Sequence, residues 1–266
     1  MKYQIAFSCV SHIGKCRKMN QDNFICNGQY LEQDSQAKEV WLKGVVPVKS
    51  PQIFGVFDGM GGEECGEVAS FLAARQATMG VIAKRTKDVE ADIKRYCLDA
   101  NAAICNYAKE HSIVCMGTTA AMLVFDKSEI VLCNIGDSKI FRFAEHKIEQ
   151  ISQDHLAISP YGTKPSLSQH LGITPEEMLI EPYIAHGQYN KGDIYLLCSD
   201  GLTDMVEVSD IENIIEYSGL ERVTSVLLEQ ALAHGGKDNI TILVCKIESK
   251  DRIWKKIMKR LLKKSL

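Results

Sequence analysis

Residues 53–62 read IFGVFDGMGG, and this stretch decides most of what the sequence predicts about the fold. Residues 53–57 are apolar apart from one glycine and lie between polar neighbours, which is the pattern of a short buried strand. Asp58 follows directly, and three of the next four residues are glycine. A carboxylate at the end of a buried strand projects at the rim of a sheet, while the strand holds its backbone still. We therefore expect a functional cleft at Asp58, with a sharp backbone turn at the glycine beside it.

The rest of the chain alternates between predicted strands and helices in blocks. Two helices are expected after Asp58, and the second has an apolar face at helical spacing, formed by Val89, Ile93, Cys97, Ala100, Ile104 and Tyr107. Short polar turns then separate four predicted strands in the manner of a meander, at 118–125, 130–135, 139–143 and 147–151. A strand at 193–198, two more helices and a last strand at 240–247 complete the pattern.

Helices inserted in pairs between groups of strands indicate the fold class. They predict an α+β fold, a four-layer α-β-β-α sandwich with two central, mainly antiparallel sheets flanked by helix pairs. Residues 1–249 form one predicted domain, in which 155–191 is a loop region. Capping-box patterns predict a short helix at Thr174–Glu177 and a helix opened by Ser209 with Glu212. The helix after that is expected to end near Gly235-Gly236.

Composition excludes several classes of protein. The chain has 266 residues, 45% hydrophobic and 24% charged, with no apolar run long enough to span a membrane and no signal-peptide pattern at its start. Its ten cysteines are scattered without a CxxC pair, so we expect reduced thiols and a cytoplasmic location. Without residues 250–266 the chain has 23 basic and 33 acidic residues, an excess of about ten negative charges that argues against nucleic acid as a partner.

Three further aspartates, Asp137, Asp200 and Asp238, also lie at the ends of predicted strands. Taken singly, such an aspartate is usually a turn former or a helix cap. Four such junctions in one chain instead favour a shared site. Carboxylates gathered in one place repel one another unless cations neutralise them. Oxygen ligands of this kind suit Mg²⁺ or Mn²⁺ better than zinc.

Six motifs in register carry a resemblance that covers roughly residues 3–247. They are Arg17-Lys18-Met19-Asn20-Gln21-Asp22, Phe57-Asp58-Gly59-Met60-Gly61-Gly62, Gly117-Thr118-Thr119-Ala120, Gly136-Asp137-Ser138, Ser199-Asp200-Gly201-Leu202-Thr203-Asp204 and Asp238-Asn239-Ile240-Thr241. In this order they resemble the type 2C family of metal-dependent serine/threonine protein phosphatases, and most closely its compact bacterial members. The resemblance implies hydrolysis of phosphoserine and phosphothreonine in proteins by a metal-activated water, reversing a serine/threonine kinase.

The resemblance also implies a role for each site residue. Asp58 would bridge two central Mn²⁺ or Mg²⁺ ions, one of which the Gly59 carbonyl would also bind. Asp200 and Asp238 would hold the other ion, and Asp137 and Asp204 would form a third, weaker site with Asp200. Asp22 would hold a metal-bound water, and Arg17 would bind the substrate phosphate as a planar, bidentate donor. The implied partners are phosphorylated proteins and the pathway of a cognate kinase, with the enzyme acting as a monomer.

Two positions depart from the family pattern, and three other functions are disfavoured by the sequence. Gln21 stands where many members have a metal-facing glutamate, and Met60 stands where eukaryotic members have a histidine proposed as general acid. Residues 155–191 resemble a short form of the family's flap, which the resemblance implies borders the site. A non-catalytic module of the same fold would lack metal carboxylates, but those named are present. A structural calcium-binding protein would show DxDxDG-type loops, which the sequence lacks. A two-metal nuclease or phosphodiesterase has no support from the acidic body or the motif set.

Residues 250–266 form a separate predicted segment, a basic amphipathic C-terminal helix. It carries eight Lys or Arg residues and one acid, and its apolar residues recur at i, i+3/i+4: Ile253, Trp254, Ile257, Met258, Leu261 and Leu262. Such a helix can lie on the inner face of an anionic membrane or dock on an acidic partner. A helix packed on the domain's own acidic rim, or a solvated tail, fits the same pattern.

Overall fold

The computed structural model describes residues 3–33, 35, 37–60, 65–79, 88–127, 129–158 and 165–249 of the chain. Two sheets form its centre, and every strand pair within them is antiparallel. The first sheet has the order β3 (Glu39–Pro47), β1 (Tyr3–His12), β12 (Ile240–Ser249), β11 (Ile194–Cys198), β8 (Lys139–Ala144) and β9 (Lys147–Gln150). The second has the order β10 (Tyr183–Gln188), β7 (Glu129–Ile135), β6 (Ala120–Asp126), β4 (Gln52–Met60) and β2 (Asp22–Cys26), with β5 (Gly117–Thr118) paired to the end of β4.

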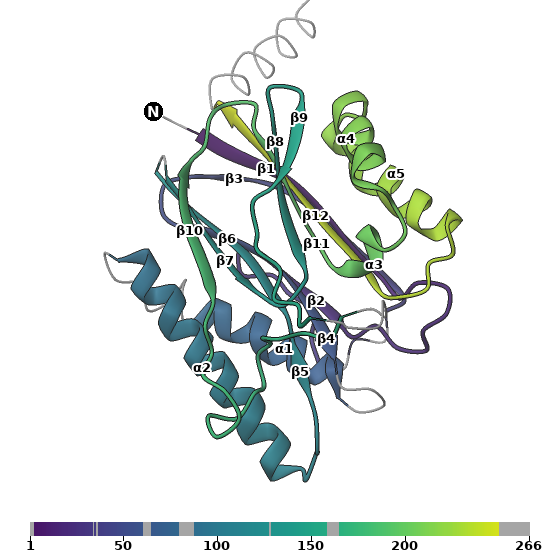
Figure 1. Cartoon of the computed structure of the whole chain (residues 1–266). Coiled ribbons are helices and arrows are strands. Elements are labelled where there is room, and N and C mark those ends of the chain that lie inside the picture. Colours follow the sequence, from purple (N-terminus) through teal and green to yellow (C-terminus); the bar gives the residue numbers. More distant parts are fainter. Residues whose placement is uncertain are drawn as a thin grey trace, which may run out of the picture.

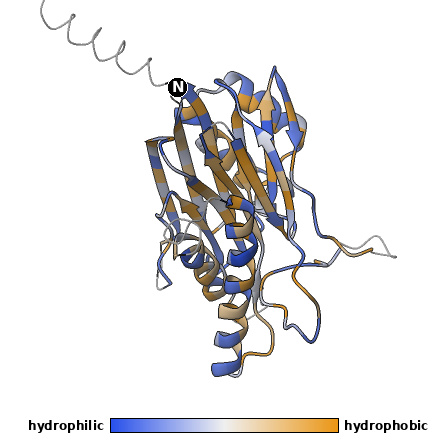
Figure 2. Cartoon of the chain, turned by 90° about the vertical axis from the view of Figure 1, so that its left-hand side faces the viewer, coloured by the Kyte–Doolittle hydropathy of each residue, from blue (hydrophilic) through white to orange (hydrophobic). Residues whose placement is uncertain are grey.

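Helices cover the outer face of each sheet (Figure 1). The second sheet carries α1 (Gly66–Ala77) and α2 (Val89–Glu110), and the first carries α3 (Asp200–Thr203), α4 (Val208–Tyr217) and α5 (Leu220–Ala233). Apolar residues concentrate along the strands (Figure 2), and the apolar residues of the helices pack against the sheets. The predicted four-layer α-β-β-α sandwich is therefore confirmed.

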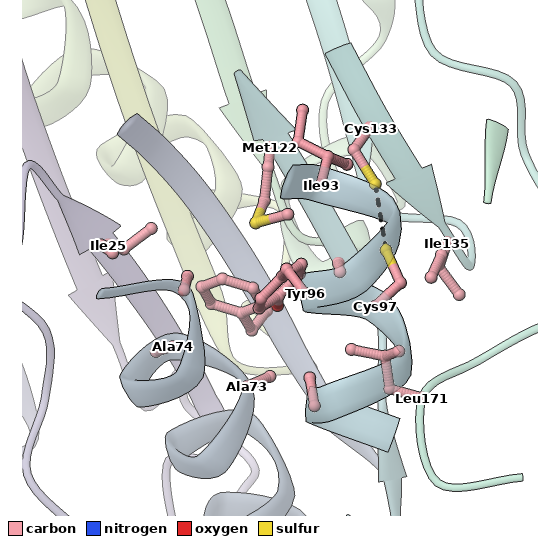
Figure 3. Close-up of a cluster of buried hydrophobic side chains, with 14 of the residues drawn as sticks. Ile25, Ala73, Ala74, Ile93, Tyr96, Cys97, Met122, Cys133, Ile135 and Leu171 are labelled. Atoms are coloured by element: carbon pink, nitrogen blue, oxygen red, sulfur yellow. Dashed lines mark hydrogen bonds between the residues drawn. The ribbon is translucent and has the colours of Figure 1, made fainter. Parts of the chain in front are cut away.

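Three apolar layers hold the sandwich together. One lies between α1, α2 and the second sheet, one between the two sheets, and one between the first sheet and α4 and α5. Figure 3 shows the first layer, in which Tyr96 and Cys97 of α2 pack against the sheet and the Cys97 thiol lies 3.7 Å from the Cys133 thiol. Leu171, from within the predicted loop region 155–191, is also buried in this layer. The predicted apolar face of α2 is confirmed, because its central residues are buried.

The predicted meander is corrected to two hairpins in different sheets. β6 and β7 pair in the second sheet, whereas β8 and β9 pair in the first. The chain crosses between sheets at Gly136–Ser138. There Gly136 adopts a φ of 95°, and a Cβ on it would lie 2.6 Å from the Thr119 side chain. Strand periodicity is the same in either sheet, so the sequence pattern alone does not reveal the crossing.

Three local predictions also change, and the sequence patterns overlooked some strands. The region 155–191 contains the strand β10, and the sequence pattern missed β1, β2 and β3 as well. At Thr174–Glu177 the capping hydrogen bonds form, with Thr174 N and Oγ1 at 3.1 and 2.9 Å from Glu177 Oε2, but they close a turn rather than a helix. Helix α4 begins one residue before Ser209, and Glu212 accepts a hydrogen bond from Ile148 N (2.7 Å) instead of closing a capping box.

The remaining predictions concern β4, α5 and the two ends of the chain. Strand β4 runs on to Met60 instead of turning after Asp58. The predicted end of α5 is confirmed, with Gly235 and Gly236 directly after its last turn. In the part of the chain that the structure describes, no helix is long and apolar enough to cross a membrane. The predicted helix at 250–266 lies outside the described residues.

Candidate active site

One pocket of about 390 Å³ lies where the ends of the two sheets meet. Asp58 reaches it from β4, Asp137 from the crossing between sheets, Asp200 from the start of α3, and Asp238 from the turn before β12. The other lining residues are Arg17, Gln21, Gly59, Met60, Thr119, Pro165, Ser166 and Leu167. The structure thus brings four of the sequence-predicted carboxylates and the predicted arginine into one pocket, although they are up to 221 positions apart in the chain.

The backbone N–H and the backbone carbonyl of Asp58 are both held by hydrogen bonds. Its backbone N–H donates to Thr119 Oγ1 (3.0 Å), and its carbonyl accepts from Thr118 Oγ1 (3.0 Å) and Thr119 N (2.9 Å). The Thr119 hydroxyl also lies 2.6 Å from the Ser138 hydroxyl. The Gly-Thr-Thr motif therefore ties Asp58 to the crossing that carries Asp137.

Glycine at position 59 serves close packing rather than a turn. A Cβ there would lie 2.2 Å from the Gly66 carbonyl oxygen and 2.4 Å from that of Gln21. Any larger residue would push α1 and the Gln21 loop away from β4. This explains a glycine within a strand, one residue before its end, where it otherwise weakens the element.

Asp22 lies behind the pocket and does not line it. It pairs with Asp58 across β2 and β4, is 3% exposed, and accepts a hydrogen bond from Ser199 Oγ (2.8 Å). Ser199 in turn accepts from Thr241 N (2.9 Å), so this network joins the two sheets. Burial raises the pKa of Asp22 to about 7, although the hydrogen bonds from Thr241 and Ser199 oppose the rise. The second carboxylate oxygen, Oδ1, is buried and has no hydrogen-bond partner among the described residues.

Arg17 is held at the mouth of the pocket by Asp238, with Nη2 and Oδ2 2.5 Å apart. The hydrogen bond to Asp238 raises the pKa of Arg17, and so do the charges of Asp58 and Asp200. The arginine side chain is about half exposed, which leaves its guanidinium accessible to a ligand.

Asn239 holds the loop that carries Arg17, residues 13–21, against the turn that carries Asp238. Its Oδ1 accepts from Gln21 N (2.8 Å), and its Nδ2 donates to the carbonyls of Ile13 (2.9 Å) and Met19 (3.0 Å). Sequence reasoning assigned no role to Asn239, Ser199, Thr119 or Ser138. Asn239, Ser199 and Ser138 each stand beside a predicted ligand, and Thr119 lies in the Gly-Thr-Thr-Ala motif; these positions were the available signal.

Asp204 and His155 lie apart from the pocket lining. Asp204 is exposed one turn after Asp200, and its N–H donates to the Asp200 carbonyl (2.8 Å). His155 exchanges two hydrogen bonds with Gly136, since Nδ1 accepts from Gly136 N (3.2 Å) and its own N–H donates to Gly136 O (2.9 Å). Burial lowers the pKa of His155. This histidine is therefore a neutral structural residue.

The charge of the pocket is strongly unbalanced. Among the described lining residues, one cation, Arg17, faces four carboxylates. Burial raises the pKa of Asp58 well above its ordinary value, and repulsion from Asp22, Asp200, Asp137 and Asp238 raises it further. Hard divalent cations would relieve this repulsion, and carboxylate oxygens are the ligands they prefer. The unpartnered Asp22 Oδ1 points to the same fit.

The ligand set is open rather than closed. Within the described ranges, no three Asp, Glu, His or Cys side chains have the spacing of a preformed site for a single ion. The carboxylates share a pocket, but Asp238 is engaged with Arg17. Binding of cations would therefore involve rotation of these side chains.

Comparisons with known proteins agree with this geometry. The family model described as protein phosphatase 2C matches residues 31–234. The chain is 28% identical over 248 residues to the serine/threonine phosphatase stp of Listeria monocytogenes, covering 87% of this chain and 91% of that protein. It is 29% identical over 217 residues to the serine/threonine protein phosphatase PstP of Mycobacterium tuberculosis, covering 75% of this chain and 41% of that one.

The fold comparison gives the same result. The catalytic domain of PstP, solved in complex with two manganese ions, superposes with a TM-score of 0.75 at 25% identity and covers 93% of this chain and all of that domain. A matching fold, a family model that spans most of the chain and a pocket lined by four aspartates lead to one conclusion. The chain belongs to the protein phosphatase 2C family.

Proposed function

We propose that this protein is a metal-dependent serine/threonine protein phosphatase, which removes phosphate from phosphoserine and phosphothreonine in other proteins. The single observation that carries the proposal is the pocket in which four aspartates face one arginine. Family membership and the phosphatase names of its bacterial relatives support it. The opposing enzyme would be a serine/threonine kinase, and the phosphatase would act as a cytoplasmic monomer.

Divalent cations complete the site in this proposal. Asp58 and the Gly59 carbonyl would hold one central ion, and Asp58 with Asp200 and Asp238 the other. Asp137 and Asp204 would add a third, weaker site with Asp200. Mn²⁺ and Mg²⁺ both suit these oxygen donors, and the two manganese ions in the PstP domain support a central pair. When bound, such ions acidify a water that can attack phosphorus and screen the charge of the phosphate.

The protein's own residues bind and orient the substrate. Arg17 offers a planar pair of N–H donors that matches two phosphate oxygens. An incoming phosphate would compete with Asp238 for this guanidinium and so free the carboxylate as it binds. Asp22, held by Ser199 with Oδ1 unpartnered, would accept a hydrogen bond from a water held behind Asp58, beside the bound ions. Met60 has no proton to donate and His155 is engaged with Gly136, so the leaving oxygen would take its proton from water.

The experiment measures hydrolysis of p-nitrophenyl phosphate and a phosphothreonine peptide with Mn²⁺. Asp58→Asn and Asp200→Asn should each lower turnover by about a thousandfold or more, because each removes a ligand of the ions. Asp210→Asn, at an exposed position on α4, is the matched control and should retain wild-type turnover. A wild-type rate no higher than that of the two pocket variants would overturn the proposal in favour of a non-catalytic phosphoprotein-binding module.

We also propose, from sequence alone, that residues 250–266 attach the enzyme to an anionic membrane surface. Eight basic residues opposite an apolar face support this. Full-length protein and a 1–249 variant should partition differently onto vesicles containing anionic lipid. Equal partition of the two would rule out membrane attachment and leave an acidic protein partner or a solvated tail.

A further inference from the structure

One wall of the pocket is formed by residues 165–167, which we call the pocket wall. Its backbone pairs with the segment that follows His155. Ala157 N donates to Ser166 O (2.8 Å), and Ser168 N donates to His155 O (2.9 Å). His155 is itself bound to Gly136, next to Asp137. The wall is therefore fixed on one side to the crossing between the sheets.

The other side of the wall is fixed by residues 171–173, which we call the anchor segment. Thr118 and Leu171 exchange two backbone hydrogen bonds, of 3.0 and 2.9 Å. The Leu171 side chain is fully buried between α2 and the second sheet (Figure 3). Gly172 has a φ of 105°, and a Cβ on it would lie 2.4 Å from the Met116 carbonyl oxygen, so the segment passes close against β5.

Asn101 of α2 binds the anchor segment from outside. Its Oδ1 accepts from Gly172 N (2.7 Å) and Ile173 N (3.1 Å), and its Nδ2 donates to Ile173 O (2.8 Å). The amide is 7% exposed, so water cannot readily replace these bonds. A buried side chain that satisfies three backbone groups of one short segment fixes that segment strongly.

We propose that Asn101 is a positioning residue for binding of the phosphoprotein substrate. It holds the anchor segment against Thr118. The pocket wall ends at Leu167, four residues before the anchor segment begins at Leu171. Residues that flank the phosphate in a peptide would contact this wall, whereas the phosphate itself meets Arg17 and the carboxylates. The inference rests on the proposed function, because it names the part of that site that recognises the protein chain of the substrate.

The test compares Asn101→Ala with Asn106→Ala, an exposed asparagine on the same helix. For a phosphothreonine peptide, Asn101→Ala should raise KM about fivefold and leave kcat within about twofold, since the wall acts on binding. For p-nitrophenyl phosphate, which has no flanking residues, KM should be unchanged. Amide protons of Gly172 and Ile173 should exchange at least about tenfold faster in Asn101→Ala. Asn106→Ala should match the wild type in every measurement.

Asn101→Asp provides a second variant, which keeps the acceptor for Gly172 and Ile173 but loses the donor. It should give an intermediate KM for the peptide, and it decides the question if Asn101→Ala does not fold. Equal peptide KM values for all folded variants, with active wild type, would overturn the role of Asn101 and leave the phosphatase assignment intact. Absence of wild-type turnover would instead overturn the proposed function, and the exchange rates would still report whether Asn101 holds the anchor segment.

Discussion

Two polar pockets lie at opposite ends of strand β11, and they differ in how their charges are balanced. The larger, of about 620 Å³, lies between the β8–β9 turn, the loop before β11 and the end of α4. There Arg142 donates to Asp193 Oδ2 from Nε (3.2 Å) and Nη2 (2.8 Å), and Asn190 N donates to the same oxygen (2.9 Å). The smaller holds Asp58 and its three partner carboxylates, with Arg17 as the one cation among the described lining residues.

This difference shows why size is a poor guide to the active site here. In the larger pocket the buried carboxylate of Asp193 has its charge paired and its hydrogen bonds made, as in ordinary structural ion pairs. In the smaller one, burial raises the pKa of Asp58, and repulsion from the neighbouring carboxylates raises it further. A cluster of like charges of this kind is retained where a bound ligand or ion compensates it. It therefore indicates a functional site more reliably than the volume of a pocket does.

The largest expected effect follows from removal of divalent cations. Treatment with EDTA should lower turnover by about a thousandfold or more, and excess Mn²⁺ should restore it. At about 100 times its Kd, Mn²⁺ should also stabilise the folded protein by about 2.7 kcal/mol, because it binds the folded carboxylates alone. Calorimetry would measure the shift in Tm. Arg142→Ala should show the full shift and Asp58→Asn little of it; equal shifts in both would contradict the contrast between the pockets.

The second largest effect is on catalysis, in which Arg17 is expected to take part and Arg142 is not. Arg17→Ala should raise KM for a phosphopeptide about 10- to 100-fold with a smaller change in kcat, because it removes a bidentate phosphate contact. Its Mn²⁺ affinity should not fall, because the variant leaves Asp238 without the competing guanidinium. Steady-state kinetics and Mn²⁺ titration would measure both, and an unchanged KM would remove Arg17 from the phosphate site.

Arg142→Ala is expected to lower the stability of the protein and to leave its catalysis unchanged. It should lower the free energy of unfolding by roughly 1–3 kcal/mol, because the carboxylate of Asp193, which is 8% exposed, loses its ion-pair partner. The arginine side chain is partly exposed to water, which limits the loss. KM and kcat should stay at wild-type values. Urea denaturation gives the stability change, and a raised KM would show that the larger pocket also takes part in substrate binding.

The smallest effect concerns pH and the metal-free protein. Burial raises the folded-state pKa values of Asp58 and Asp22 above 3.8, to about 7 for Asp22. The folded state then binds protons more tightly than the unfolded chain, so these groups contribute less stability as pH rises from about 4 to about 7. The free energy of unfolding of the wild type relative to Asp58→Asn should therefore fall by at least about 1 kcal/mol over this range, because each unit of pKa shift contributes about 1.4 kcal/mol.

Urea titrations in EDTA at several pH values would measure that difference. Saturating Mn²⁺ should abolish it, because bound cations replace the protons. A rise in the relative stability of the wild type between pH 5 and 7 would mean that the carboxylates do not repel one another as the geometry indicates.

Much of the fold could be predicted, because local patterns repeat over whole elements. The apolar face of α2 and the strands of the two hairpins follow from periodicity alone. Strands such as β3, an exposed edge of mixed composition, and β10, within a Gly- and Pro-rich region, lack a strong pattern. Their pairing with β1 and β7 is what makes them strands, and pairing is a long-range property.

The candidate site divides in the same way. The sequence by itself determined which side chains could carry the chemistry, because all six aspartates lie in recognisable motifs and four of them stand at the ends of predicted strands. Only the tertiary structure decided their arrangement: Asp58, Asp137, Asp200 and Asp238 line one pocket, Asp22 lies buried behind them, and Asp204 lies outside. The same holds for Asn101, whose amide has no distinguishing motif. A residue's chemistry is local, but its burial and its neighbours depend on how two sheets pack, and no short stretch of sequence contains that information.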